Sequence, residues 1–565
     1  MTRGPYRPKA RAAGPRRLRV VACPGLSHKE GSLKRLIACV SFLALLGAPL
    51  SPAQERPDLD AVTRIRAEGL RNSSVMQLAS ELMDGVGPRL TGSTNLKLAE
   101  DWARQRLAGW GLANVHLENW GPFGRGWEYD KSSVRMTAPD RAQLLALPEA
   151  WTPGTSGPIH APAIYVKAAA KEDLDKYKGK LAGRIVLFGD VAETRAHDKP
   201  ESERYDEKSL SELFEYEMPG GPPRYDRETY RKRRELNRVA TKFFAGEKAL
   251  AVLTPSRHDG SVLQVQSAGS YKKDEEPAAL PELVLSLDHY GRIVRLLERN
   301  IPVDLEIDVQ ARFLEPDPQQ SNVVAEIPGA DKRGEVVMLG AHFDSWHSGT
   351  GATDNGAGSV VMMEAMRILK TLGVAPRRTI RLALWTGEEQ GLLGSKAYVA
   401  EHFATRPEVT DPEQKKLPDY LQKPTFPITT KPEHAKLSGY FNVDNGTGRI
   451  RGIYAEENSA IGPVFQSWME PLKDLGVTTV TMRRTGGTDH ESFDQVGLPG
   501  FQFIQDQIEY DTRTHHTNLD TYERLQRNDL MQAAVVVACF VWDAAQRPDM
   551  LPRKPMPQPP PGEKK

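Results

Sequence analysis

The sequence predicts an α/β fold in which a mixed, mainly parallel sheet carries helices on both faces and is interrupted by a β-rich insertion domain. From residue 322 onward, short apolar runs alternate with amphipathic helical segments, a pattern typical of parallel strands joined by crossover helices. Residues 118–314 instead hold short β-like runs bounded by Gly, Pro and Asp. The chain has 565 residues, too many for one core, so more than one structural unit is expected.

The first 53 residues form an N-terminal extension typical of a signal peptide. A basic stretch precedes an apolar run over residues 36–46, which is too short to span a bilayer. The small residues that follow suit cleavage near Ala53, so we expect a secreted or periplasmic protein with no membrane-spanning segment after cleavage. The apolar run follows Cys39 instead of preceding it, and lipid anchoring at this cysteine is therefore not expected.

Residues 54–117 are predicted to form the N-terminal helices of the main domain. Leu59, Val62 and Ile65 recur at helical spacing, which indicates a helix with one buried face. Ser93 or Thr94 is placed to cap a second helix that runs to about Leu107.

The remainder of the main domain is expected over residues 315–546. Its predicted strands are 336–340, 378–385, 440–443 and 500–504, and its predicted helices are 358–372, 392–403, 461–475 and 527–545. The Pro-rich residues 547–565 are expected to form a disordered tail.

Between these two parts, residues 118–314 are expected to form the inserted module. Its predicted strands are 163–166, 184–188, 249–254 and 282–286. The charged stretch 193–238 is interpreted as a solvated helix and loop. Two roles for the module remain open at this point: a wall of a substrate cleft, or a surface for homodimerisation.

The composition restricts the chemistry. The formal net charge is +1, which argues against a nucleic-acid-binding protein. Cys23, Cys39 and Cys539 are too few for a disulfide framework or a thiolate metal site. Cys539 lies in an apolar run and is expected in the core. Any metal ion must therefore be held by His, Asp and Glu.

Such side chains follow every predicted strand of the main domain, where open α/β sheets bind their ligands. They are His342, Asp344 and Asp354 after the first strand, Glu388 and Glu389 after the second, Asp444 after the third, and His515 and His516 after the fourth. One such residue is more often a turn or a helix cap. Four strands that all deliver them to one edge indicate a metal site.

The residue types indicate which metal chemistry is expected. Imidazole nitrogen and carboxylate oxygen suit zinc, cobalt or manganese. Two histidines with three carboxylates are too many for one tetrahedral ion with an open position, so we expect two divalent ions, Zn²⁺ first, that share a carboxylate. Glu388 and Glu389 repel each other, which is explained if one binds a metal and the other carries protons. Asp344 is placed to orient the imidazole of His342.

Three sequence strings around these residues resemble metallopeptidase family 28, the co-catalytic zinc aminopeptidases and carboxypeptidases. They are residues 340–346 (GAHFDSW), 385–395 (WTGEEQGLLGS) and 485–493 (TGGTDHESF). The resemblance covers about residues 57–117 and 315–546. The middle segment is similar to the protease-associated domain of the carboxypeptidase Q and glutamate carboxypeptidase branch. The resemblance implies a zinc-peptidase-like fold and a secreted di-zinc exopeptidase: an aminopeptidase, a carboxypeptidase or a dipeptidase acting on peptides.

The resemblance also implies a role for each position. The implied ligands are His342 and Asp444 on one ion, Glu389 and His516 on the other, and Asp354 as the bridge. Glu388 would be the general base for a metal-bridging hydroxide, passing its proton to the leaving amine.

The resemblance also bears on three further positions. Some family members have Tyr directly before the last ligand histidine, where it stabilises the oxyanion. Here that residue is His515, which either donates a hydrogen bond to the oxyanion or packs behind the metal site. Asp489 and His490 resemble a loop near the substrate, for which a substrate contact and a structural role both remain open.

Three other functions were weighed against the exopeptidase. A receptor that has lost catalysis would show substituted ligand positions, and here all of them are intact. A glutaminyl cyclase normally lacks the inserted module and uses a single zinc ion. An amide deacylase acting on a non-peptide substrate is compatible with the same residues.

Overall fold

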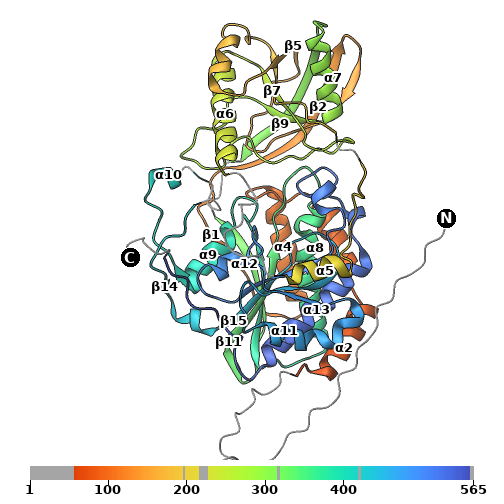
Figure 1. Cartoon of the computed structure of the whole chain (residues 1–565), viewed down its shortest axis with the longest axis vertical. Helices are drawn as coiled ribbons and strands as arrows, with labels where there is room; N and C mark the ends of the chain where they lie inside the picture. Colours follow the sequence, from red (N-terminus) through yellow and green to blue (C-terminus); the bar gives the residue numbers. More distant parts are fainter. Residues whose placement is uncertain are drawn as a thin grey trace, which may run out of the picture. The chain divides into compact units, whose positions relative to one another are not determined.

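The computed structural model describes residues 56–559 apart from 195–196, 216–226, 315–318, 416 and 418–421 (Figure 1). All elements below belong to one compact unit, Glu55–Lys565. The predicted signal peptide and Cys39 lie outside the described residues.

A mixed eight-stranded sheet forms the centre of the main domain. In spatial order its strands are β1 (Ala113–Trp120), β10 (Gln320–Ile327), β12 (Arg378–Trp385), β11 (Lys332–His342), β15 (Leu437–Asn442), β18 (Gly500–Gln505), β16 (Ile450–Tyr454) and β17 (Thr479–Thr481). The central strands β12, β11, β15 and β18 are parallel, whereas β10 and β16 join them antiparallel. The predicted mixed α/β fold is confirmed.

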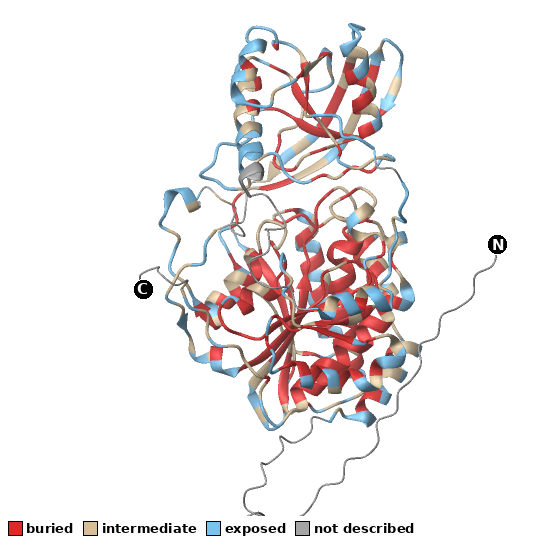
Figure 2. Ribbon diagram, in the orientation of Figure 1, coloured by how far each residue is buried: buried red, intermediate tan, exposed pale blue. Residues whose placement is uncertain are grey.

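Helices cover both faces of this sheet because alternate strand residues point to opposite sides. Leu339 of β11 belongs to one buried cluster, and its neighbour Met338 belongs to another. Figure 2 shows both layers in red. The first face packs against α2 (Leu59–Arg71), α3 (Val75–Met83), α4 (Thr94–Gly109), α8 (Ala357–Thr371), α11 (Gly462–Met469) and α13 (Arg527–Gln546), and the second against α9 (Leu393–His402) and α12 (His490–Asp494).

The N-terminal helices follow their predicted pattern in most respects. The side chain of Ser93 accepts a hydrogen bond from the backbone N–H of Leu96 and caps α4. Val62 and Ile65 of α2 are buried, but Leu59 at the start of the helix is 61% exposed. The spacing therefore identified the buried face of α2, except that Leu59 at its start is exposed.

Helix α13 is the core helix of the main domain. Among the described residues, it is the helix whose length and hydropathy would suit a membrane span, but 89% of its apolar window is buried inside the fold. Cys539 lies in this helix and is buried, as expected.

A second eight-stranded sheet lies within residues 126–314. Its strands in spatial order are β3 (Ala142–Leu144), β2 (Gly126–Ala138), β9 (Asp304–Leu314), β5 (Ile159–Val166), β6 (Ile185–Phe188), β7 (Ala251–Pro255), β8 (Glu282–Leu285) and β4 (Ala146–Pro148). Two helices pack on opposite faces, α6 (Arg227–Gly246) beside Val186 and α7 (Leu287–Glu298) beside Leu187. We call this β-rich body the inserted module.

The boundary of the module differs from the prediction at one end. Strand β1 pairs antiparallel with β10 and belongs to the sheet of the main domain, so the module begins after Trp120 and not at residue 118. The predicted boundary was wrong because the strand that pairs with β1 lies about two hundred residues further along the chain. The strand propensity of a segment does not indicate which strand it will pair with.

Part of the charged stretch 193–238 returns to the main domain. Residues 201–215, here called the return segment, include α5 (Glu207–Phe214). Glu203 and Ile508 exchange two backbone hydrogen bonds of 2.7 and 2.8 Å. Arg204 lies 2.9 Å from the carboxylate of Asp506. The interpretation as a solvated helix and loop holds for most side chains of this part, with Leu210 the buried residue of α5. It missed the partners of Arg204 and of the Glu203 backbone, which lie more than 300 residues away.

The Pro-rich tail is another correction. Residues 547–559 are not disordered: Leu551 is 2% exposed, and the Arg553 guanidinium donates to the backbone oxygen of Leu437 at 2.7 Å. Lys554 donates to the backbone oxygen of Glu456 at 2.7 Å. A Pro-rich composition removes backbone donors, but it leaves such side chains free to attach the segment to the body.

Glu100 on α4 provides a stability test. Burial raises the pKa of this 5%-exposed carboxyl to about 8. The folded state therefore binds more protons than the unfolded state from roughly pH 4.5 to pH 8, and this carboxyl lowers stability as the pH rises through that range. We expect Glu100→Gln to leave thermal unfolding nearly unchanged at pH 5 and to stabilise the protein by ~1–3 kcal/mol at pH 9. Equal effects at the two pH values would contradict the assignment.

Candidate metal centre

The carboxyl edge of the central strands brings together all five predicted metal ligands. His342 is the last residue of β11, and the following loop leads to Asp354 in the short turn Ala352–Gly356 before α8. The other three follow different strands: Glu389 follows β12, Asp444 follows β15, and His516 follows the turn Tyr510–Thr514 after β18.

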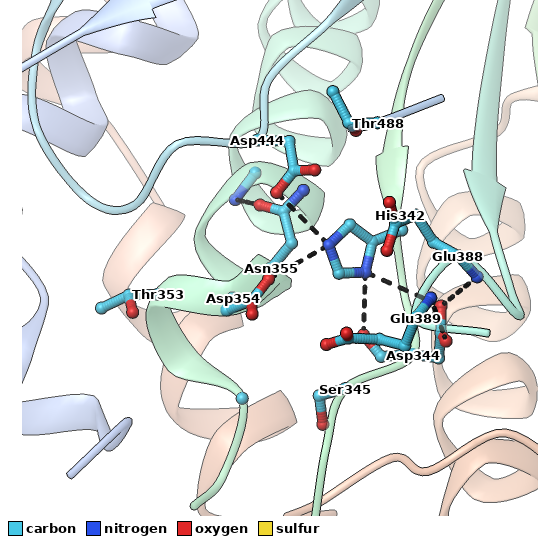
Figure 3. Close-up of polar contacts among 12 residues, drawn as sticks. His342, Asp344, Ser345, Thr353, Asp354, Asn355, Glu388, Glu389, Asp444 and Thr488 are labelled. Carbon is cyan, nitrogen blue, oxygen red and sulfur yellow. Dashed lines mark hydrogen bonds and ion pairs between the residues drawn. The ribbon is translucent and has the colours of Figure 1, made fainter. Parts of the chain in front are cut away.

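The first group of ligands is centred on His342. Its Nε2 atom lies 3.2 Å from Asp354 Oδ1 and 3.3 Å from Asp444 Oδ1. Figure 3 shows these two carboxylates approaching the same ring nitrogen. All three side chains are nearly buried, with side-chain exposures of 1%, 4% and 8%.

The second group is centred on His516. Its Nε2 atom lies 3.2 Å from Asp354 Oδ2 and 3.0 Å from Glu389 Oε2. Asp354 therefore belongs to both groups and uses a different oxygen in each. This is the arrangement that a carboxylate shared between two cations requires.

The residues fit divalent cations by a second criterion. Asp354 Oδ2, Glu389 Oε1 and Asp444 Oδ1 are buried and accept no hydrogen bond from the described residues. Buried carboxylate oxygens without donors are costly, and a bound cation removes that cost. Imidazole and carboxylate are the donor set that zinc accepts.

The same buried carboxylates also determine the protonation of the two histidines. Burial alone would lower both pKa values, but the neighbouring carboxylates outweigh it. Asp444 contributes most to raising the pKa of His342 well above its ordinary value, and Glu389 and Asp354 raise the pKa of His516 to about 10. Protons occupy these nitrogens where a cation would bind, so metal binding must release them.

Asp344 holds the turn that carries the two glutamates. Its Oδ1 atom accepts from the backbone N–H of Glu388 at 3.2 Å, and its Oδ2 atom accepts from the hydroxyl of Thr91 at 2.8 Å. His342 Nδ1 lies 3.0 Å from the backbone oxygen of Asp344 and 3.7 Å from its carboxylate. Asp344 thus orients the imidazole through its backbone, while its carboxylate fixes the position of the glutamate turn (Figure 3).

Two residues that the sequence did not single out support the same loops. The buried guanidinium of Arg89 donates to the backbone oxygens of Phe343 and Gly351 at 2.8 Å each. Asp520 accepts from the backbone N–H groups of Thr353 at 2.6 Å and Asp354 at 3.2 Å. Neither residue carries a spacing signal, because each acts on backbone atoms of a distant loop.

Glu388 lies beside this cluster without joining it. No ion pair connects its carboxylate to either ligand histidine in the described site. Burial raises the pKa of Glu388 well above its ordinary value, and it raises that of Glu389 to about 7. The two adjacent glutamates therefore differ in position: one contacts His516, and the other remains available for proton transfer.

His515 lies against both the cluster and Tyr510. Its Nε2 atom is 3.9 Å from Asp354 Oδ2, and its ring centroid is 3.8 Å from that of His516 and 4.9 Å from that of Tyr510. Burial and the neighbouring His516 lower the pKa of His515 to about 4, so the ring is neutral near pH 7 and retains one N–H donor. Its part in catalysis stays a prediction.

Asp489 and His490 lie at the start of α12, and both are fully buried. His490 Nε2 lies 3.2 Å from the backbone oxygen of Thr485 and 3.6 Å from the carboxylate of Glu456. Burial raises the pKa of Asp489 to about 7. Their contact with a substrate stays a prediction, and the described contacts of His490 are internal to the fold.

The inserted module reaches the ligand His516 directly. Gln266 places its side-chain nitrogen 2.9 Å from His516 Nδ1, and the backbone N–H of Val265 donates to the His516 oxygen at 3.0 Å. On the other side of the same loop, the Trp346 ring centroid lies 6.1 Å from those of His516 and Trp151, the latter a residue of the module. No pattern in the sequence indicates these contacts.

Two imidazoles and several buried carboxylates at the carboxyl edge of an α/β sheet define a metal-dependent hydrolase. Residues 322–541 match the model of peptidase family M28, so this part of the chain is similar to that family. Together with the curated relatives, this match supports a hydrolase of the metallo-exopeptidase class.

Several curated relatives share the sequence at low identity. Carboxypeptidase Q of Bos taurus is 28% identical over 484 residues, which cover 86% of this chain and 87% of the relative. Carboxypeptidase Q of Homo sapiens is 27% identical with the same coverage. Aminopeptidase YwaD of Bacillus subtilis is 28% identical over 222 residues, or 38% of this chain and 42% of the relative.

Solved structures share the fold. A peptidase M28 precursor from Shewanella amazonensis has a TM-score of 0.60 and 24% identity, and the match covers 88% of this chain and 99% of that one. A zinc aminopeptidase from Bacillus subtilis has a TM-score of 0.51 and 18% identity, with 84% and 95% coverage.

Metal binding gives a direct test of the two ligand groups. We expect the metal-free protein to bind about two Zn²⁺ ions per chain and to release protons as it does so, because cations displace protons from His342 and His516. The affinity should fall as the pH falls. Calorimetric titration in buffers of different ionisation enthalpy measures both the stoichiometry and the proton release. A firm stoichiometry of one would contradict the shared role of Asp354.

Proposed function

We propose that this protein is a di-zinc exopeptidase that hydrolyses peptide bonds near a chain terminus. The observation that carries the proposal is Asp354, whose two carboxylate oxygens face two separate histidine-centred groups. Each group offers nitrogen and oxygen donors of the kind that zinc prefers.

His342, Asp444 and Asp354 would hold one ion, and His516, Glu389 and Asp354 the other. When bound, the pair of ions would activate the attacking water and stabilise the negative charge that develops on the scissile carbonyl oxygen. A grouping of possible ligands by distance alone would also admit His515 beside Asp354 and His516. Glu389 is the better ligand because its oxygen is 3.0 Å from His516 Nε2, whereas His515 is 3.9 Å from Asp354.

Glu388 would move the proton. Its carboxylate lies next to the ligand cluster without an ion pair to a ligand histidine, so it can accept a proton from the attacking water and pass it to the leaving nitrogen. The backbone hydrogen bond from Glu388 to Asp344 holds the turn in place during both transfers. Cations in the cluster would favour the ionised carboxylate, which is the form that a base requires.

The neighbouring His515 would act as a neutral hydrogen-bond donor. A ring N–H that points to the carbonyl oxygen of the substrate would stabilise the charge that forms there. Its low pKa keeps this ring from competing as a cation with the metal ions.

The two arginines before the 485–493 string, Arg483 and Arg484, are candidates for binding a substrate carboxylate. Arg483 Nε donates to the backbone oxygen of Glu215 at 2.7 Å, and Arg484 lies 3.3 Å from Asp494. Both guanidinium groups therefore have partners within the fold.

Export is part of the proposal. The basic stretch and the apolar run of residues 36–46 support a cleaved signal peptide and a secreted or periplasmic location. The β-rich inserted module is proposed to be a protease-associated domain. Homodimerisation remains a prediction.

The general-base assignment can be tested by one substitution. We expect Glu388→Gln to bind metal with the wild-type stoichiometry and to lose turnover by at least a factor of about 10². Metal analysis and dipeptide hydrolysis, with a chelator-treated sample as background, measure the two effects. Near-normal turnover in this variant would sink the assignment, and loss of metal would show that Glu388 is a ligand.

Exopeptidase action can be tested with end-blocked peptides. One peptide sequence is offered free, amino-blocked, carboxyl-blocked and blocked at both ends. We expect no cleavage of the doubly blocked form and loss of cleavage when one particular end is blocked, because a terminal charge must be recognised. Mass spectrometry of the products identifies that end. Cleavage of the doubly blocked peptide would indicate an endopeptidase, and hydrolysis of non-peptide amides alone would indicate a deacylase.

A further inference from the structure

The inserted module forms a short backbone ladder with the loop that carries the metal ligand His516. The N–H of Val265 donates to the His516 oxygen at 3.0 Å, and the N–H of Asn518 donates to the Leu263 oxygen at 3.0 Å. The side-chain oxygen of Asn518 accepts from the N–H of Leu263 at 2.7 Å. A ligand of the main domain thus lies against an edge of the module.

His516 needs this support because of its backbone conformation. Its φ is +61°, in the left-handed region that non-glycine residues rarely adopt. Such a conformation persists only where surrounding contacts determine it. The His516 oxygen accepts from Val265 N–H and also from the Ser348 hydroxyl at 3.3 Å, so one contact comes from the module and one from the main domain.

The side chain of Gln266 completes the arrangement. It lies 2.9 Å from His516 Nδ1, while Nε2 of the same ring faces Asp354 and Glu389. An imidazole that binds a metal through Nε2 carries its proton on Nδ1, and that N–H needs an acceptor. The Gln266 amide can supply this acceptor. A 180° flip of the amide group exchanges its nitrogen and oxygen, so that the oxygen faces Nδ1.

We infer that Gln266 is a positioning residue for His516, so that the inserted module completes one half of the metal centre. This inference rests on the proposed two-metal function. In the half built on His342, the partner of Nδ1 is the backbone oxygen of Asp344 in the main domain and not a residue of the module. We therefore expect Gln266 to affect one ion and not the other.

Three variants separate this role from a general effect on folding. Gln266→Leu keeps the size of the side chain and removes the acceptor. Gln266→Glu keeps an acceptor for the Nδ1 proton. Gln264→Leu is the matched control, because Gln264 lies in the same segment and contacts the loop through a backbone bridge to Thr517. Gln266 is exposed, so we expect an effect near the lower end of the roughly 10- to 100-fold range for outer partners of metal ligands.

The measurement is a Co²⁺ titration of the metal-free full-length protein against a competing chelator, followed by visible absorption. We expect wild type, Gln266→Glu and Gln264→Leu to bind two ions with similar affinities. Gln266→Leu should weaken one of the two sites about tenfold and alter one component of the Co²⁺ spectrum. Thermal unfolding of the metal-free proteins should be the same for all four.

The outcomes distinguish failure of the inference from failure of the proposed function. Wild-type protein that binds fewer than two Co²⁺ ions would overturn the two-metal proposal and this inference with it. Wild-type protein that binds two, together with a Gln266→Leu variant whose two affinities are both unchanged, would overturn the inference alone. The same holds if Gln266→Glu or Gln264→Leu weakens binding as much as Gln266→Leu does, because the effect would then come from local structure.

Discussion

Buried negative charge is the constraint on which the catalytic body depends. Asp354, Glu389 and Asp444 converge on two imidazoles at the edge of one sheet, with Glu388 beside them. Like charges repel strongly where water is scarce, so this arrangement is stable only with protons or cations between the carboxylates. Two residues outside the ligand set hold the loops that carry these side chains. Arg89 binds backbone oxygens with its guanidinium, and the carboxylate of Asp344 holds the glutamate turn.

The module and the main domain meet at the loop that carries His516. His516 follows a turn after the edge of the parallel strands, and among the described residues no strand of the main sheet pairs with this loop. The module supplies a neighbour through Val265, and the return segment holds the preceding residues through Glu203 and Ile508. Two parts of the insertion therefore fix one loop from different sides. The insertion therefore contacts the candidate site directly.

The sequence predicted those features that depend on local pattern. Strand β12 spans the predicted residues 378–385, and the five proposed ligands meet because strand ends share an edge. Features that depend on distant pairing were missed. β1 joined the main sheet through β10, and Arg204 found Asp506 across some 300 residues. The proposed role of Gln266 could not be predicted from the sequence for the same reason. It depends on a contact with His516, 250 residues away, and the residues next to Gln266 in the sequence do not indicate that contact.

Helix α13 gives the main domain an unusual order of assembly. It fills the core between α2 and α8, and Trp542 near its end donates to the carboxylate of Asp58 at the start of α2 at 3.2 Å. The first helix of the described chain is thus completed by the last one. Contacts between residues so far apart in the sequence form slowly, because the conformational entropy of the long chain segment between them must first be lost. During synthesis, the surface of α2 that packs against α13 therefore stays uncovered until nearly the whole chain has emerged.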